Sequence, residues 1–230
     1  MGLDLAAAAY TASTWVLPVL LAITLHEAAH GYVAWRLGDD TAYRLGRVSF
    51  NPLRHVDPFG TLVLPALLFL LRAPFLFGWA KPVPVAFGRL RQPRRGMVLV
   101  AAAGPATNLG IAAVSALLFH LLALVPETVA LWAARNLYNS ILINLVLAVF
   151  NMLPLPPLDG GRVAVGLLPR SLALPLARME RYGLLILIAV IFLLPLLGGE
   201  LGLDLDLFTY LIWTPVQWLL PLFHGLAGIA

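Results

Sequence analysis

Hydrophobic residues along this chain gather in long runs that are separated by short polar segments. Six runs stand out, at residues 11–35, 59–78, 97–125, 129–153, 183–198 and 207–223. An α-helix rises about 1.5 Å per residue, so about 20 apolar residues are enough to cross the hydrocarbon core of a bilayer. The pattern therefore predicts an all-α polytopic membrane protein in which most of these runs are transmembrane helices.

The second run, at 59–78, differs from the others because prolines and an arginine interrupt it. Pro65, Arg72 and Pro74 lie within it, and irregular backbone at membrane depth is tolerated only against protein or a wet cavity. Basic residues follow both the first and the second run: Arg36, Arg44, Arg47 and Arg54, then Lys81, Arg89, Arg91, Arg94 and Arg95. A full span between these clusters would place one of them outside, against the positive-inside rule. We therefore predict a re-entrant hairpin at 59–78.

The charges in the rest of the chain fit the same topology. The third run ends without a basic residue, the fourth returns to several arginines, and the fifth leads to an acidic loop: Glu127, then Arg162, Arg170, Arg178 and Arg181, then Glu200, Asp204 and Asp206. Arg135 alone disagrees. The last run, rich in Tyr and Trp, either spans the bilayer or lies in its interface. The chain thus predicts about four to five transmembrane helices, with the basic loops in the cytoplasm.

Composition supports a membrane setting and limits the metal chemistry. Of 230 residues, 61% are hydrophobic and 11% are charged, and the mean hydropathy is +0.91; a soluble domain would carry about 25% charged residues. The net charge of +4 is explained by membrane orientation, so no nucleic-acid partner is expected. Without cysteine, any metal must use His and carboxylate ligands. We predict one membrane domain over 1–230, with a catalytic core at about 11–165 and C-terminal helices at about 175–225.

The most informative motif lies inside the first run, where ionisable residues interrupt an apolar helix. His26, Glu27 and His30 form a His-Glu-x-x-His sequence. A glutamate at mid-membrane costs about 2.5 kcal/mol or more, so a segment that carries one usually uses it. Residues i and i+4 share one face of a helix, so both imidazoles can bind one metal ion while the carboxylate acts as general base. This motif predicts metal-assisted hydrolysis within a membrane.

A catalytic zinc site usually has three protein ligands and an open position for water, so a third ligand is needed. Asp159 is the best candidate, at the inner end of the fourth run in the sequence FNMLPLPPLDGGRV. Its three prolines prevent a regular helix, and its two glycines permit close backbone approach. We therefore expect Asp159 on an extended segment that leans toward the first helix.

These motifs together resemble the site-2 protease family of intramembrane zinc metalloproteases. HEAAH resembles the family's zinc-and-base motif, Asn151 to Gly161 its second motif, and GPATN, from Gly104 to Asn108, a further element. The resemblance covers about residues 15–165. Its pattern is similar to the short prokaryotic members that lack PDZ and CBS domains, which implies a prokaryotic cell membrane.

The resemblance also implies roles for individual residues. His26, His30 and Asp159 would bind Zn²⁺, and Glu27 would be general base and proton shuttle. Asn151 would stabilise the oxyanion. The substrate would be a membrane protein with a single span, cleaved within or near its transmembrane segment; the oligomeric state is left open. We also consider Asn108 for substrate binding, although a buried Asn often only bridges helices.

The segment after the predicted hairpin contains alternating prolines, AKPVPVAF at residues 80–87. Pro82 and Pro84 lack N–H groups on one side, which leaves the donors of Val83 and Val85 on the other, as in an edge strand. We therefore predict a short membrane-associated β segment whose free edge binds an unwound substrate. The alternative is that the segment anchors the hairpin at the membrane surface.

Other functions remain open from the sequence. One is a metal-binding membrane protein without protease activity, either a zinc carrier or a catalytically inactive chaperone; a carrier should show inverted repeats, which are not evident. Another is a membrane HExxH enzyme that trims prenylated or soluble tails. His55 and Asp57 could form a second polar site, but an N-terminal cap on the hairpin is the simpler interpretation.

Overall fold

Helices make up most of the part of the chain that can be described. We use a computed structural model, which describes residues 5–70, 78–203 and 205–229. Regular structure in these residues is entirely helical, without a β-strand. The prediction of an all-α integral membrane protein is confirmed. The predicted β segment at residues 80–87 is not confirmed, because residues 78–86 have no regular secondary structure and Phe87 begins a 3₁₀ turn.

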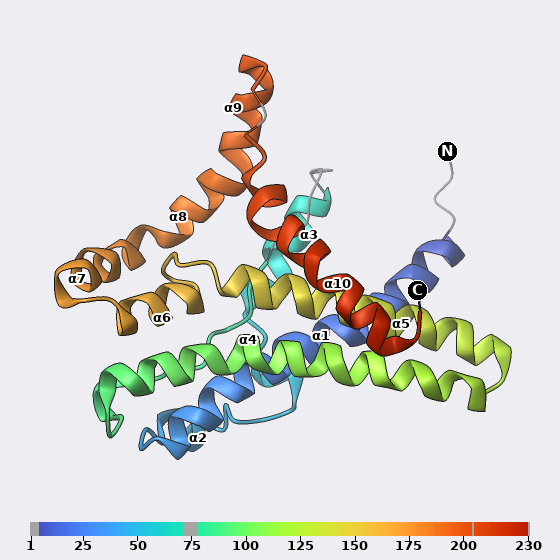
Figure 1. The fold of residues 1–230 in the computed structure, drawn as a ribbon, viewed down its shortest axis with the longest axis horizontal. Coiled ribbons are helices and arrows are strands. Elements are labelled where there is room, and N and C mark those ends of the chain that lie inside the picture. The colour runs from blue at the N-terminus through green and yellow to red at the C-terminus, as the bar shows by residue number, and fades with distance from the viewer. Residues whose placement is uncertain (1–4, 71–77, 204, 230) are drawn as a thin grey trace.

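Three long helices form the body of the molecule: α1 (Leu5–Arg36), α4 (Pro93–Leu118) and α5 (Glu127–Asn151). They lie alongside one another in Figure 1. Within the described residues, these three helices are long and apolar enough to cross a membrane, α4 being counted with the 3₁₀ turn η4 (Phe119–Leu124). Ala112 and Ala116 are fully buried in one cluster with Ile141 and Leu145, and such small side chains let membrane helices approach closely.

The C-terminal part consists of shorter helices. α6 (Asp159–Leu167) and α7 (Arg170–Arg178) follow α5, and the turn η5 (Met179–Tyr182) leads into an arm made of α8 (Gly183–Ile188), the π-helical η6 (Ala189–Leu193) and α9 (Leu194–Leu201). The π-helical η7 (Thr209–Trp213) begins α10 (Thr214–Ala227), which packs against α4 and α5. The predicted total of four to five spans counts this arm and α10 and stays a prediction.

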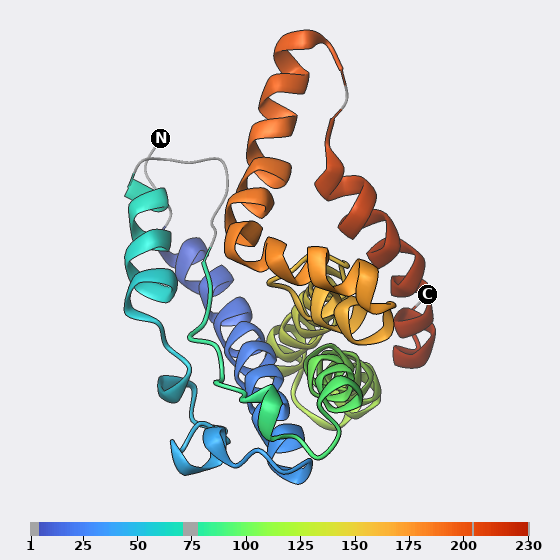
Figure 2. The same ribbon diagram turned by 90° about the vertical axis from the view of Figure 1, so that its left-hand side faces the viewer.

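The segment at 59–78 returns beside its own starting point. After the turn η1 (Pro52–Arg54), η2 (Pro58–Val63) and α3 (Leu64–Leu70) leave the bundle. The Trp79 N–H donates to the Gly60 carbonyl over 3.1 Å, which joins the two ends. Asp57 accepts from the N–H groups of Phe59 and Gly60, so it caps η2 as expected. Arg72 and Pro74, which belong to the predicted hairpin, lie outside the described residues. Viewed as in Figure 2, α3 and the α8–α9 arm project from the bundle in the same direction.

From the hairpin, an extended segment at residues 78–86 runs back to α4 and is held by backbone hydrogen bonds. The Lys81 N–H donates to the His55 carbonyl over 2.9 Å. The Ala86 N–H donates to Asp39 Oδ2 over 2.6 Å, just beyond the end of α1 and before the short helix α2 (Thr41–Arg44). The turn η3 (Phe87–Arg89) then leads into α4. These contacts fix the segment alongside α1, where the polar motif lies.

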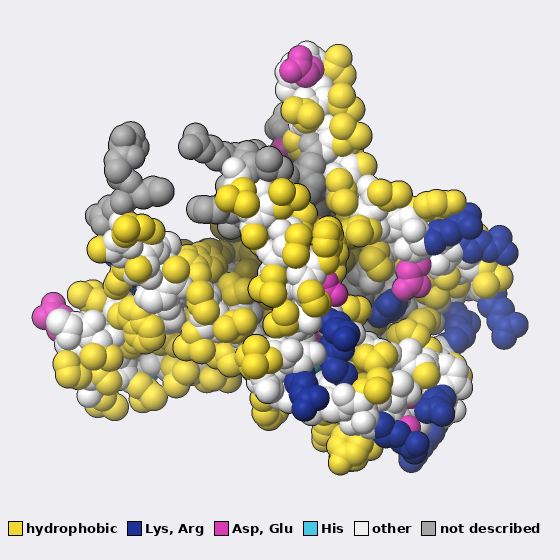
Figure 3. Space-filling model, turned by 180° about the vertical axis from the view of Figure 1, so that it is seen from behind, with side chains coloured by type: hydrophobic (Ala, Val, Ile, Leu, Met, Phe, Trp, Pro, Cys, Tyr) yellow, Lys and Arg dark blue, Asp and Glu magenta, His cyan; other side chains and the backbone are white. Residues whose placement is uncertain are grey.

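Most basic side chains on the face drawn in Figure 3 lie on one side of it. In Figure 3 the Lys and Arg side chains lie together at one side of the visible face, while hydrophobic side chains cover most of the remainder. Asymmetry of this kind orients membrane proteins. It agrees with the grouping of basic loops that the sequence predicted.

Candidate metal centre

His26 and His30 lie one helical turn apart on α1 and turn their imidazoles to the same point. Their Nε2 atoms are 3.0 Å apart, and both rings are buried. Two imidazole nitrogens can lie this close when both present their lone pairs to one cation.

Asp159 is the third member of the cluster, although α1 and α6 are distant in sequence. Its Oδ2 lies 3.2 Å from His26 Nε2 and 3.3 Å from His30 Nε2. It stands at the first residue of α6, so the expectation of an extended segment is wrong at this position, while residues 152–158 are indeed irregular. A Cβ on Gly160 would lie 2.2 Å from the Met152 carbonyl oxygen. The glycines are therefore needed for α6 to start against the preceding turn.

The outer nitrogens of both imidazoles are held by hydrogen bonds. His30 Nδ1 lies 2.7 Å from the Val100 carbonyl oxygen, and His26 Nδ1 lies 2.6 Å from Asn108 Oδ1. A backbone carbonyl only accepts, so His30 Nδ1 carries the hydrogen and Nε2 presents its lone pair to the centre. Both partners belong to α4, which therefore orients the ligands on α1.

Gly104 lets α4 pass directly beside the two histidines. A Cβ at this position would lie 2.5 Å from both His26 Cε1 and His30 Nε2, closer than any real contact. Any side chain would displace an imidazole from the cluster. The glycine of the GPATN element thus has a steric role at the metal centre.

The donor set fits zinc. His26, His30 and Asp159 each offer one ligand atom, and these atoms all lie within 4.8 Å of one another. Two imidazole nitrogens and one carboxylate oxygen form a catalytic zinc set with a position left for water. Asp159 Oδ2 is buried and receives no hydrogen bond from the described residues, which is costly for a carboxylate unless a cation neutralises it.

Glu27 lies beside the ligands and is half-buried. Its Oε2 accepts a 2.8 Å hydrogen bond from the Val83 N–H of the extended segment. Val83 is itself buried. The prediction that its N–H forms a free edge for substrate is therefore wrong, because this donor is used within the protein.

Arg47 supports the same segment and was not singled out by the sequence. Its Nη2 donates to the Lys81 carbonyl over 2.6 Å, although the side chain is buried. Burial lowers the pKa of the guanidinium, and the charge of Glu27 opposes this shift. Arginine stays charged at neutral pH, so Arg47 places a positive charge near Glu27.

A cavity of about 420 Å³ opens on this cluster. The residues that line it come from several parts of the chain, among them His26, Glu27 and His30 on α1, Trp79, Val83 and Val85 on the extended segment, Val100 and Ala101 on α4, Phe150 and Asn151 at the end of α5, Asp159 and Arg162 on α6, and Leu184 and Leu187 on α8. The cavity therefore places Glu27, Asn151 and Val85 around one space with the three ligands.

Asn151 and Asn108 are both near the centre but differ in accessibility. Asn151 lines the cavity, and its Nδ2 donates to the Leu147 carbonyl over 3.0 Å, which leaves its second N–H. Asn108 is fully buried behind His26. Its assignment to substrate binding is wrong, because its amide is used by neighbouring helices.

The geometry defines a metallohydrolase-type centre within a bundle of membrane helices, and sequence comparisons identify the family. The signature of peptidase family M50 matches residues 121–194. "Putative zinc metalloprotease YwhC" of Bacillus subtilis is 41% identical over 185 residues, 79% of this chain and 80% of that protein. No solved structure was found to match.

Two proteins named "Putative zinc metalloprotease Rip2" are more distant relatives. That of Mycobacterium tuberculosis is 34% identical over 184 residues, 78% of this chain and 66% of that protein. That of Mycolicibacterium smegmatis is 30% identical over 178 residues, 75% and 64% of the two chains. The chain belongs to peptidase family M50, the site-2 protease family, and its cofactor is zinc.

Proposed function

We propose that this protein is an intramembrane zinc metalloprotease that hydrolyses peptide bonds within or near the transmembrane segments of membrane proteins. The observation that carries the proposal is the convergence of His26, His30 and Asp159 beside Glu27 at the wall of one cavity. A carrier or an inactive chaperone has no need of a carboxylate held beside the ligands. A protease requires one.

The residues of the chain divide the chemistry between them. Zinc, when bound by His26, His30 and Asp159, would acidify water and polarise the scissile carbonyl. Glu27 would take a proton from water and pass it to the leaving amine. The second N–H of Asn151 would stabilise negative charge on the carbonyl oxygen. The buried Arg47 would hold the extended segment in place beside Glu27 through its hydrogen bond to the Lys81 carbonyl.

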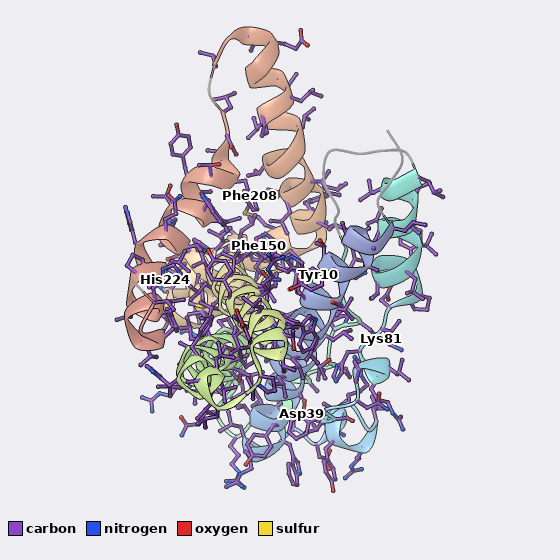
Figure 4. All side chains as sticks on the ribbon, turned by 90° about the vertical axis from the view of Figure 1, so that its right-hand side faces the viewer. Tyr10, Asp39, Lys81, Phe150, Phe208 and His224 are labelled. Atoms are coloured by element: carbon purple, nitrogen blue, oxygen red, sulfur yellow. The ribbon has the colours of Figure 1, made fainter. Side chains whose placement is uncertain are left out.

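A second cavity supports access for a membrane substrate. It has a volume of about 780 Å³ and lies among α1, α5, the hairpin and the C-terminal segments; Phe150 and Phe208, labelled in Figure 4, both line it. It shares Ile23, Trp79 and Leu147 with the cavity at the metal centre, so the two adjoin. Its lining is mostly apolar, which suits a transmembrane segment that unwinds toward the ligands.

The proposed substrate is a single-span protein of a prokaryotic cell membrane. The active site of the protease would lie toward the cytoplasm. The gathered basic side chains (Figure 3) support this orientation through the positive-inside rule. Val85 faces the cavity, and we propose that the extended segment there contacts the unwound substrate.

The test separates metal binding from proteolysis. We expect Glu27→Gln to retain one zinc by elemental analysis yet cleave a single-span substrate in vesicles at least about a hundredfold more slowly, because an amide cannot accept the proton. Asp159→Ala should lose zinc as well as activity. Cleavage by Glu27→Gln at the wild-type rate would rule out this mechanism. A zinc-loaded wild type that cleaves no membrane protein would favour a non-proteolytic function.

A further inference from the structure

Asn144 is fully buried in the middle of α5, away from the cavity at the metal centre. Its Oδ1 lies 2.7 Å from Asn108 Nδ2, and Asn108 Oδ1 lies 2.6 Å from His26 Nδ1. We propose that Asn144 is a positioning residue for the metal centre, which acts through Asn108 to hold His26 in its metal-binding tautomer. The proposal rests on the metal site of the proposed function and not on proteolysis.

The direction of the hydrogen bonds that link Asn144, Asn108 and His26 is fixed by backbone carbonyls at both asparagines, because a carbonyl can only accept. Asn144 lies 2.8 Å from the Ser140 carbonyl through one side-chain atom, so that atom must be Nδ2 and the opposite atom is the oxygen. Asn108 likewise lies 3.3 Å from the Ala22 carbonyl, so that atom is also an amide nitrogen. The amide of Asn108 therefore turns its oxygen to His26.

The consequence for His26 follows from the chemistry of an amide oxygen. Because Asn108 Oδ1 can only accept, His26 Nδ1 must carry the hydrogen, and the lone pair lies on Nε2. That Nε2 is the atom that faces Asp159 Oδ2 at 3.2 Å. If Asn108 turned over, it would present a donor to Nδ1, and the hydrogen would move to Nε2, where it blocks metal binding. Asn144 opposes this rotation because its oxygen would then face the oxygen of Asn108.

The simpler role of a buried Asn is to join two helices, and the chain contains a matched example. Asn139, on the same helix, is buried and donates from Nδ2 to the Thr14 carbonyl of α1 over 3.0 Å. Its amide bonds to Thr14, twelve residues before His26, and not to a ligand or a partner of a ligand. Asn139 therefore provides the control for a purely structural contribution.

The experiment measures zinc affinity by competition with a chelator in the purified full-length protein. Loss of a hydrogen-bond partner of a metal ligand typically weakens metal binding about 10-fold to 100-fold. We expect Asn144→Leu, which keeps the shape but removes the amide, to weaken zinc binding about tenfold, and Asn139→Leu to leave it unchanged. Asn144→Asp should stay close to wild type, since a buried neutral carboxyl can both donate and accept. Equal affinities for Asn144→Leu and Asn139→Leu would overturn the proposal.

A double substitution tests whether the two amides act as one unit. Asn108→Leu already removes the acceptor of His26, so Asn108→Leu with Asn144→Leu should bind zinc no more weakly than Asn108→Leu alone. Fully additive losses would contradict the proposal.

The metal-free tautomer gives a readout that does not require zinc. In ¹⁵N-histidine NMR spectra, in which His26→Asn assigns the His26 signals, the Nδ1–H form of His26 should be lost in Asn144→Leu and kept in Asn139→Leu. An unchanged His26 tautomer in a folded Asn144→Leu variant would also overturn it.

Discussion

The backbone N–H of Val83 donates to Glu27 Oε2 over 2.8 Å, so the extended segment before α4 holds the proposed general base beside the metal ligands. A carboxylate with one oxygen fixed in this way has a defined orientation toward the centre. The proline-rich segment therefore completes the site on α1, a role that its sequence alone does not reveal.

Val83→Pro removes this donor and should slow proteolysis about tenfold or more, the scale of one hydrogen bond to a charged group. Zinc content should not change, because no ligand is touched. Proline suits an extended position between two other prolines. Val83→Ala, which keeps the N–H, is the matched control. If both variants cleave a membrane substrate equally well in vesicles, the hydrogen bond does not position Glu27.

Gly104→Ala should abolish high-affinity zinc binding, because the new Cβ would lie 2.5 Å from His26 Cε1 and His30 Nε2. Gly110→Ala on the same helix is the control, since a Cβ there meets no described atom within 4 Å. It should bind zinc like wild type and be slightly more stable, since alanine favours a helix over glycine by about 1 kcal/mol. Elemental analysis and thermal unfolding decide the comparison. Normal zinc content in folded Gly104→Ala would refute the steric role.

Asp39 joins the end of α1 to the extended segment and should stabilise the fold. It is buried, and its two oxygens accept from separate groups, Thr41 on Oδ1 and Ala86 N–H on Oδ2. The Asp39→Asn substitution places an amide nitrogen against one of these donors. We expect it to lower the free energy of unfolding by about 1–3 kcal/mol, measured by thermal unfolding in detergent. Asp40→Asn, which affects an exposed ion pair with Arg44, should have little effect.

The same variant has a defined pH dependence. Burial acts to raise the pKa of Asp39, but the hydrogen bonds from Thr41 and Ala86 outweigh it, and the pKa lies below its usual value. The stabilisation is therefore fully present above the pKa of the unfolded chain, about 4, and is lost as the pH falls through the lower pKa of the folded state. The difference between wild type and Asp39→Asn should shrink in that acidic range. A constant difference from neutral to acidic pH would contradict it.

Prediction from sequence succeeded where the chemistry is local. The i, i+4 spacing places His26 and His30 on one face, and the Asp57 cap and the irregular turn before Asp159 follow from nearby residues. The partners that come from other helices were not predictable. Val100 and Asn108 meet the histidines, and Asn144 meets Asn108, through the register of α4 against α1 and α5, which packing decides. The alternation of Val83 with proline predicts an N–H on one edge of the segment. It does not say which group that N–H faces, and in the structure it faces Glu27.

The topology of the hairpin can be tested because the chain has no cysteine. The described helical part, η2 and α3, comprises 6 and 7 residues, about 20 Å at 1.5 Å per residue, which is shorter than the hydrocarbon core of about 30 Å. We therefore expect single cysteines at Arg54 and Arg91, both exposed, to react with an impermeant maleimide from the cytoplasmic side. A cysteine at Glu200, also exposed, should react from the opposite side.

The fully buried Leu145 provides the control for an intact fold, because a cysteine there should react only after unfolding. Inverted vesicles and intact cells report the two faces separately. Labelling of Arg54→Cys and Arg91→Cys from the same face supports the hairpin, because a span between them would put them on opposite sides. Labelling from opposite faces would mean that residues 59–78 cross the bilayer. The Gly60–Trp79 hydrogen bond could not then form in the membrane, and the extended segment could not reach Glu27.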